Sequence, residues 1–245
     1  MKAMLFFLFW VPQVCLAFTL IDNIQGYPDS PLRVHLNSVC PDGVSSELDG
    51  AIEFWNGAPN SGLVVERGAD VNYAPAQVLT GAFAETVVVY CSNNFAAETG
   101  ADPDTILGLG AGLDTDDDGR LDLGVLLLNT TDGALANFQS ADGATRELTV
   151  VHEMGHVLGL GHSSVEGAIM YFSTNGKGSV NLHQDDIDGI RHLYPQNELG
   201  GDYPLGCGTV VNRQTPKRNP AGLFLLLLPL LLTLGLRSFG KPFLS

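Results

Sequence analysis

The chain has 245 residues, of which 45% are hydrophobic, and a formal net charge of −15. The stretch from Asp22 to Asp202 contains all 27 acidic residues but only six of the twelve basic ones, so it carries a net charge of −21. This excess argues against nucleic acid as a partner, because the phosphate backbone attracts basic surfaces. The length suits one buried domain with appendages, since an apolar segment at each end raises the hydrophobic percentage.

The first 17 residues, MKAMLFFLFWVPQVCLA, have the pattern of a cleaved secretory signal. Lys2 precedes a short apolar run, and the small residues Cys15 and Ala17 suit cleavage after Ala17. A membrane anchor is the alternative, although the run is short for one. We therefore expect an exported protein, extracellular or at the cell surface, whose residues 18–30 form a short N-terminal segment.

Residues 31–196 are expected to form one α+β domain. Short runs rich in branched residues predict strands at 32–37 (LRVHLN), 63–66 (LVVE), 86–90 (TVVVY) and 123–129 (LGVLLLN). The first predicted helix follows a cap at Ser45 or Ser46 and has Leu48, Ile52 and Trp55 at helical spacing. Two further helices are predicted over 145–158 and over 185–194, the second ending before Pro195. Strands come first and helices later, which favours the α+β class.

Three of the six histidines lie within eleven residues, in HEMGHVLGLGH from His152 to His162. On a helix, His152 and His156 are one turn apart on the same face, so that their imidazoles can meet at one metal ion. Gly159 and Gly161 permit tight backbone angles, so they can end the helix and bring His162 to the same ion. Three neutral protein ligands leave the fourth position of tetrahedral zinc open, which is typical of a catalytic site.

Glu153 follows the first ligand but is rotated about 100° around the helix, so it can act on a zinc-bound water instead of ligating. Zinc lowers the pKa of bound water to about 7 and polarises a carbonyl, which makes attack on a peptide bond feasible near neutral pH. Lone histidines are more often hydrogen-bonded core or surface residues than ligands. The complete pattern, however, would arise by chance in a chain of this composition with odds on the order of one in 10⁵.

This stretch resembles the zinc signature of the metzincin peptidases. Ser163 after the third histidine, and AIMY with Met170, make it similar to the matrixin branch, and LHQDDIDGIRHLYP from Leu182 resembles that family's closing helix. The resemblance implies a twisted mixed sheet, an active-site helix, a methionine turn with Met170 beneath the metal, and a C-terminal helix. It also implies that Tyr171 and Phe172 line the substrate pocket, although many matrixins have proline where Phe172 stands.

By the same resemblance, LGVLLLN (123–129) is expected to be the edge strand that pairs with an extended protein or peptide substrate. Only about a dozen residues separate the expected signal cleavage site from the first strand, so the family's usual inhibitory prosegment is not expected.

Export would place Cys40, Cys91 and Cys207 in an oxidising compartment, where disulfides persist. We expect a bridge between Cys40 and Cys91, with Cys207 left over in the tail. A zinc-blocking thiol at Cys40 is the alternative.

The loop LDTDDDGRLD (113–122) has the spacing of a calcium-binding loop. With Asp114 as the first position of such a loop, the oxygen ligands would come from its first, third, fifth and ninth positions, namely Asp114, Asp116, Asp118 and Asp122. Val125 stands where a bidentate glutamate is usual, so this is not an ordinary EF-hand. A solvated acidic turn is the alternative.

The composition changes after residue 196. Residues 197–220 read as a linker that contains Cys207, and residues 221–245 as a hydrophobic tail whose apolar run from Ala221 to Leu236 precedes basic residues. The order resembles C-terminal sorting tails of bacterial surface proteins, in which the tail is cut and Cys207 would be a lipidation or processing site. A plain membrane anchor is the alternative, since the run is marginal for spanning a bilayer.

The sequence thus predicts an exported, monomeric zinc endopeptidase, with calcium as a second metal and a membrane contact through its tail. The alternative from another class is a calcium-stabilised surface binding or adhesion module with a non-catalytic zinc site. The presence of Glu153 beside the ligands argues against it, because a structural site needs no base. Hydrolysis of a non-protein amide is a third reading.

Overall fold

The computed structural model describes residues 18–21, 24–173, 177 and 180–196. By its internal contacts the chain divides into Met1–Pro204 and Leu205–Ser245, and every described residue belongs to the first unit. The expected signal (1–17), linker (197–220, with Cys207) and tail (221–245) lie outside the described residues and stay predictions. Among the helices that are described, none combines the length and apolar character that a bilayer crossing requires.

Five strands form one mixed sheet in the order β2-β1-β3-β5-β4. Their bounds are β1 Leu32–Leu36, β2 Val65–Arg67, β3 Val87–Ser92, β4 Gly108–Leu113 and β5 Leu123–Asn129. The neighbours from β2 to β5 pair in parallel, whereas β4 runs antiparallel to β5. This arrangement confirms the α+β class and the mixed sheet.

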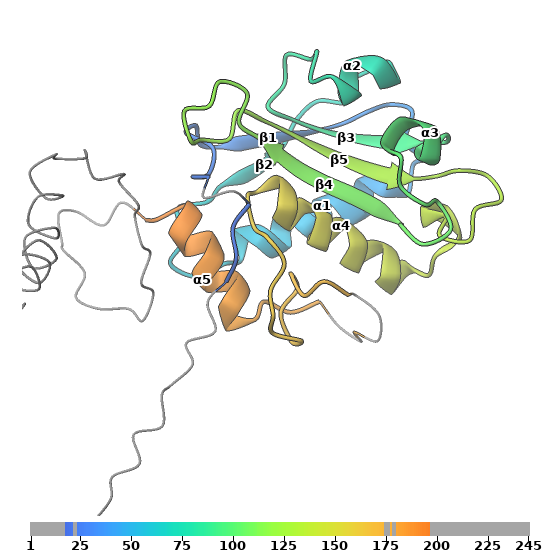
Figure 1. Cartoon of the computed structure of the whole chain (residues 1–245). Coiled ribbons are helices and arrows are strands. Elements are labelled where there is room, and N and C mark those ends of the chain that lie inside the picture. The colour runs from blue at the N-terminus through green and yellow to red at the C-terminus, as the bar shows by residue number, and fades with distance from the viewer. Residues whose placement is uncertain (1–17, 22–23, 174–176, 178–179, 197–245) are drawn as a thin grey trace, which may run out of the picture. The chain divides into compact units, whose positions relative to one another are not determined.

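Helices cover both faces of the sheet (Figure 1). The long helices α1 (Val44–Asn56) and α4 (Gly143–Val157) lie on one face, and the short helices α2 (Pro75–Leu79) and α3 (Phe95–Thr99) lie on the other. A short 3₁₀ turn at Phe138–Ser140 precedes α4 in the chain, and the last helix, α5 (Gln184–Leu193), follows α4. Because successive residues of a strand point to opposite faces, Val87 and Val89 join the larger core with α1 and α4, whereas Val88 and Tyr90 join the smaller cluster. Burial on both faces explains why the central strands read as unbroken apolar runs.

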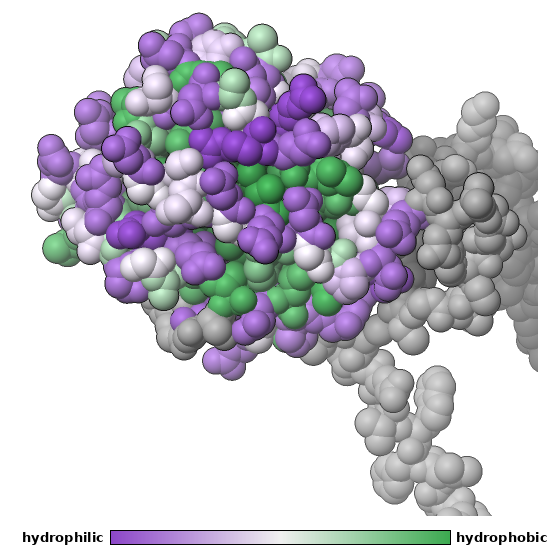
Figure 2. Space-filling model, turned by 180° about the vertical axis from the view of Figure 1, so that it is seen from behind, coloured by the Kyte–Doolittle hydropathy of each residue, from purple (hydrophilic) through white to green (hydrophobic). Residues whose placement is uncertain are grey.

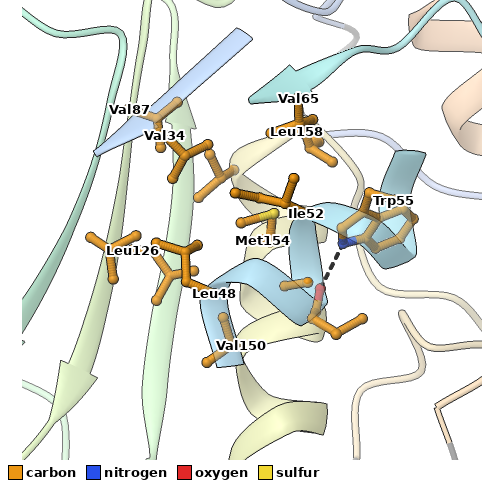
Figure 3. Close-up of a cluster of buried hydrophobic side chains, with 14 of the residues drawn as sticks. Val34, Leu48, Ile52, Trp55, Val65, Val87, Leu126, Val150, Met154 and Leu158 are labelled. Atoms are coloured by element: carbon orange, nitrogen blue, oxygen red, sulfur yellow. Dashed lines mark hydrogen bonds between the residues drawn. The ribbon is translucent and has the colours of Figure 1, made fainter. Parts of the chain in front are cut away.

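The main core fills the space between the sheet and the helices α1 and α4 (Figure 3). Its largest fully buried side chain is Trp55, on the apolar face of α1, and Met154 of α4 packs in the same layer. The Trp55 Nε1 donates a hydrogen bond of 2.9 Å to the Val151 carbonyl oxygen, so the indole both fills volume and satisfies its polar atom. Burying a side chain of this size contributes about 3 kcal/mol to stability.

The two long helices are also joined at the start of α4. Asp142 caps α4 by accepting a hydrogen bond of 3.0 Å from the Thr145 N–H, and the Arg146 Nε lies 2.8 Å from the Glu47 Oε1 on α1. The side chain of Glu47 is only 8% exposed, so this ion pair is better shielded from water than the other ion pairs of the described residues. The contact fixes where α4 begins relative to α1.

The cap predicted for α1 is wrong. The helix starts at Val44 with Gly43 as its N-cap and has no side-chain cap, so Ser45 and Ser46 lie inside the first turn. Ser46 instead donates its hydroxyl back to the Gly43 carbonyl oxygen, at 2.9 Å. A serine within the first turn competes for local backbone groups without capping the free N–H groups.

The edge strand predicted for substrate pairing is also wrong. The predicted strand LGVLLLN is β5, which pairs with β3 on one side and with β4 on the other, so no edge of it is free. The edge strand next to β5 is β4, whose sequence GLGAGL lacks the branched residues that favour strands. Its glycines serve close approach: a Cβ on Gly110 would lie 1.9 Å from the Glu153 carbonyl oxygen of α4, and one on Gly112 would lie 2.6 Å from the Val157 carbonyl oxygen.

A disulfide joins Cys40, just after β1, to Cys91 in the neighbouring strand β3. The sulfur of Cys40 is therefore bonded within the fold, which overrules the alternative that it blocks zinc as a free thiol. A disulfide is consistent with the expected export.

The surface is largely hydrophilic on the face seen in Figure 2, with hydrophobic residues gathered in smaller areas between polar ones. That pattern agrees with a strongly acidic domain that keeps its apolar residues inside.

Replacing Gly110 by alanine tests the contact between β4 and α4. The added Cβ meets main-chain atoms that cannot rotate away, so Gly110→Ala should lower the free energy of unfolding by about 1–3 kcal/mol. Gly50→Ala in α1 is the matched control, because its Cβ meets nothing within 4 Å and should stabilise the helix by about 0.5–1 kcal/mol. Urea denaturation measures both; equal effects of the two alanines would contradict the close approach.

Candidate metal centre

The structure brings the three predicted histidines together. His152 and His156 lie one turn apart on α4 and His162 lies beyond its end, and each offers a ring nitrogen within 4.8 Å of the others. The Nε2 atoms of His156 and His162 are 3.2 Å apart. Ring nitrogens this close, from two different segments, define a centre that one cation can occupy.

Backbone carbonyls fix the orientation of two of these rings. The Nδ1 of His152 lies 2.8 Å from the Ile169 carbonyl oxygen, and the Nδ1 of His156 lies 2.8 Å from the Leu160 carbonyl oxygen. A carbonyl only accepts, so each Nδ1 carries the proton and each Nε2 presents its lone pair to the shared centre. This arrangement, in which the second ring nitrogen holds the tautomer, is typical of metal-binding histidines.

The surroundings of His152 and His156 favour their neutral form. Burial lowers the pKa of His152 to about 4 and lowers the pKa of His156 as well, and the neighbouring imidazoles act in the same direction. Neutral imidazole is the form that ligates metal. Three imidazole donors with no carboxylate or thiolate among them fit zinc with one coordination position left for water.

Glu153 lies on α4 beside the ligands and in contact with the edge strand. Its Oε2 accepts a hydrogen bond of 2.7 Å from the Gly110 N–H of β4. Burial raises the pKa of Glu153 to about 8, although the Gly110 hydrogen bond acts in the opposite direction. The carboxyl group is therefore held at a fixed place and titrates near neutral pH in the metal-free protein, as a proton-transfer group should.

The turn after α4 carries the third histidine. Gly159 has a φ of 102°, its N–H bonds to the His156 carbonyl oxygen, and the Leu160 N–H bonds to the Gly155 carbonyl oxygen. These two bonds around a left-handed glycine form a Schellman motif, which ends the helix as predicted. Gly161 does not share the left-handed φ; it is small because a Cβ there would lie 2.6 Å from the Thr19 Oγ1.

Met170 is buried below the ligand helix, where a Cβ on Gly155 would lie 2.2 Å from its Sδ. The turn that carries it is tied to α5, because Asp186 accepts hydrogen bonds from the Ile169 and Met170 N–H groups at 2.9 and 3.0 Å. The same Ile169 holds His152 through its carbonyl oxygen. The carboxylate of Asp186 thus orients a metal ligand through one intervening residue.

Tyr171 and Phe172 follow this turn. Tyr171 pairs with Ser163 in an isolated bridge, and its ring contacts the ring of Phe172 with centroids 4.4 Å apart. The side chain of Phe172 is 66% exposed. Both residues therefore follow the buried methionine on the chain that leaves the metal centre, but Phe172 faces solvent.

The acidic loop gathers three of its four predicted ligands. Asp114, Asp116 and Asp122 place carboxylate oxygens within 4.8 Å of one another, and Asp118 is not among them. Asp118 instead accepts from the Arg120 N–H at 2.8 Å, and its own N–H donates to Asp114 and Asp116. These hydrogen bonds within the loop hold the Asp118 carboxylate apart from the other three carboxylates.

The mixed sheet, the ligand helix, the buried methionine turn and the closing helix together define a zinc metallopeptidase domain with a three-histidine site. A comparison with protein families supports the same class and narrows it, because residues 77–195 match the family described as Matrixin. The matched residues, just under half of the chain, are therefore similar to a matrixin catalytic domain.

Curated relatives match a shorter stretch. The chain is 52% identical over 67 residues to Metalloendoproteinase 2-MMP of Arabidopsis thaliana, 62% over 52 residues to Metalloendoproteinase 1 of Glycine max, and 48% over 61 residues to the interstitial collagenase of Bos taurus. These alignments cover 26%, 21% and 23% of this chain, but only 18%, 17% and 13% of the respective relatives. The matched part is thus less than a fifth of each relative's length.

Several supporting residues were not predicted from the sequence. Tyr27 and Tyr194 donate their hydroxyls to the Val157 and Leu158 carbonyl oxygens at 3.1 and 2.9 Å, which satisfies groups that the end of α4 leaves free. Gly110, which positions Glu153, lies in a strand that was missed altogether. No local pattern marks these partners, because each contact joins segments more than 30 residues apart.

The raised pKa of Glu153 makes the stability of the metal-free protein depend on pH. The folded state keeps the proton to about pH 8, whereas the ordinary value is 4.5, so the unfolded state ionises first and stability is lost as the pH rises from 4.5 through 8. Glu153→Gln removes this loss, so its stability advantage over the unchanged protein should grow across that range. Urea denaturation at several pH values in the presence of a chelator measures this, and parallel curves would contradict it.

Proposed function

We propose that the protein is an exported zinc endopeptidase that hydrolyses internal peptide bonds of proteins or peptides. The observation that carries the proposal is the convergence of three imidazoles beside a carboxyl group whose pKa is raised by burial to about 8. The matrixin match of residues 77–195 supports it. An adhesion module with a structural metal site would need the histidines but not Glu153.

The residues divide the chemistry as follows. His152, His156 and His162 would hold zinc, which supplies a lowered water pKa and a polarised substrate carbonyl when bound. Glu153 takes a proton from the attacking water at one carboxylate oxygen and later gives a proton to the leaving amine. The Gly110 N–H anchors the other oxygen, so the carboxyl group stays in place between the two transfers.

The substrate is proposed to lie along β4. The odd-numbered residues of β4 direct their main-chain polar groups towards β5: the Leu113 carbonyl oxygen accepts a hydrogen bond from the Asp122 N–H. The even-numbered residues direct theirs away from β5, as shown by the Gly110 N–H, which donates to Glu153. In an antiparallel strand the N–H and C=O of one residue point to the same side, so the carbonyl oxygens of Gly108, Gly110 and Gly112 face away from β5. An extended peptide can add to this edge through main-chain hydrogen bonds.

Met170 is proposed to form the floor beneath the metal, and Tyr171 and Phe172 to contact the substrate residue that follows the cut bond. The turn is buried at Met170 and reaches solvent at Phe172, which supports a position of these aromatic residues at the mouth of a pocket.

Calcium is proposed as a second metal, held by Asp114, Asp116 and Asp122. Hydrogen bonds from the Thr115 N–H and hydroxyl, both at 2.6 Å, lower the pKa of Asp122 and keep it ionised, as a ligand for a hard cation must be. The loop joins β4 to β5, so a bound cation would stiffen the end of the proposed substrate strand.

We also propose, from the sequence, that the protein is exported and then released or anchored at the cell surface. Residues 221–245 would contact the membrane, and Cys207 would be a processing or lipidation site. The disulfide between Cys40 and Cys91 supports export, because such bonds persist in oxidising compartments.

Replacing Glu153 by glutamine tests the enzymatic reading. Loss of a general base and acid should lower peptide turnover by about 10²–10⁴-fold, while zinc measured in the purified protein stays at one ion per chain. Glu147→Gln is the matched control, because Glu147 is an exposed carboxylate on the same helix and should leave turnover unchanged. Unchanged turnover in Glu153→Gln would refute the assigned role.

Calcium binding is tested by thermal unfolding. A cation that binds only the folded state stabilises it by about 2.7 kcal/mol at a hundred times its dissociation constant, so calcium should raise the melting temperature with increasing concentration. Asp116→Asn should abolish most of the rise, whereas Asp118→Asn should keep it, because Asp118 is not part of the group. An equal loss in both variants, or no response of the unchanged protein, would overturn the assignment.

A further inference from the structure

The N-terminal strap, which we define as residues 18–21, lies against the turn that carries the third histidine. Leu20 pairs with Leu160 in an antiparallel bridge. The Ile21 N–H donates to the Gly159 carbonyl oxygen at 3.1 Å, and the Gly161 N–H donates to the Thr19 carbonyl oxygen at 2.9 Å. The strap is therefore bonded through its main chain to the segment between α4 and His162.

Thr19 makes a further contact that reaches the ligand residue itself. Its hydroxyl donates a hydrogen bond of 2.5 Å to the His162 carbonyl oxygen. Gly161 allows this approach, because a Cβ at that position would lie 2.6 Å from the Thr19 Oγ1. The main chain is thus held on both sides of the peptide group that joins Gly161 to His162.

His162 depends on such support more than the other two ligands. The rings of His152 and His156 are fixed by carbonyl oxygens, whereas no residue in the described part of the chain accepts a hydrogen bond from the Nδ1 of His162. His162 is also exposed, His156 half-buried and His152 buried, so packing restricts it least. Its ring position is therefore set mainly by its backbone.

The strap is itself anchored away from the metal. The ring of Phe18 lies 5.5 Å from the ring of His192 on α5, and a Cβ on Gly189 would meet the Phe18 side chain at 3.4 Å. Leu160, paired with Leu20, is 1% exposed. These contacts connect the turn to α5, so the strap is part of the packed fold and not a loose end.

We propose that Thr19 is a positioning residue for the zinc ligand His162, acting through the backbone of Gly161 and His162. The inference rests on the proposed zinc site but not on peptide hydrolysis. Holding the turn before the metal arrives removes part of the entropy cost of ordering the ligand. Loss of outer partners of a metal ligand costs about 10–100-fold in metal affinity, and the indirect route through the backbone places Thr19 at the lower end.

The test is zinc affinity of the full chain, measured by competition with a chromophoric chelator, for Thr19→Val and Thr19→Ser. Valine has the shape of threonine without its hydroxyl, so Thr19→Val should weaken zinc binding about tenfold, whereas Thr19→Ser keeps the hydroxyl and should bind within about twofold of the unchanged protein. The absorption spectrum of the cobalt-substituted protein should shift in Thr19→Val only.

Thr80→Val is the matched control, because the Thr80 hydroxyl also donates to a backbone carbonyl oxygen, that of Ala76 at 2.7 Å, but at the C-cap of α2. It should leave zinc affinity unchanged, and the circular dichroism of every variant checks that it folds. Gly161→Ala provides a second route, since its Cβ would push Thr19 away, and combining it with Thr19→Val should add little further loss.

Zinc affinity of Thr19→Val within twofold of the unchanged protein, or an equal loss in Thr80→Val, would overturn the inference. Tight zinc binding without any peptide turnover would instead refute the proposed function and leave the role of Thr19 standing.

Discussion

The helix α4 has to satisfy two requirements at once, and the rest of the structure depends on this. One face must pack against the sheet and α1 through residues such as Val150 and Met154, and another must present His152 and His156 to a polar centre. Since side chains one turn apart share a face, the ligands and the core residues occupy separate stripes of the same helix. A rotation of the helix would therefore disturb the core and the metal centre together.

The surroundings of α4 restrict that rotation from several directions. Arg146 ties its start to Glu47, Trp55 bonds to its middle, and Tyr27 and Tyr194 bond to its last carbonyl oxygens. On the far side, the carboxylate of Asp186 holds Ile169, whose carbonyl oxygen orients His152. Burial raises the pKa of Asp186, while its three backbone hydrogen bonds oppose that rise, so the same contacts that position the turn also stabilise the charge.

The sequence predicted what depends on local patterns. The spacing of His152 and His156 identifies the ligand helix, and the glycine at 159 identifies its end, because helix periodicity and left-handed backbone leave direct marks in the sequence. The central strands were also predicted, since burial on both faces makes them continuous apolar runs. The fold class followed from their order.

The features that were missed depend on contacts between distant segments. The strand β4 reads as a glycine-rich loop, and only the backbone of α4 pressed against it explains Gly110 and Gly112. The edge was therefore assigned to β5, whose apolar sequence reflects the opposite situation, a strand covered on all sides. Asp118 fits the calcium spacing, but its carboxylate accepts from the Arg120 N–H and does not lie in the group formed by the other three aspartates. Thr19 carries no signal at all, because its partner is a main-chain oxygen 143 positions away.

The absence of side chains on one face of β4 has a further consequence. The glycines of β4 bring its main chain directly against the main chain of α4. The distance between β4 and α4 is therefore set by main-chain atoms alone. A polypeptide that pairs with β4 would thus have its main chain at a fixed distance from the three histidines, whatever its own side chains are. Selectivity among polypeptides would then depend on the side chains around the strand, and substitutions there would alter preference without moving the reacting bond.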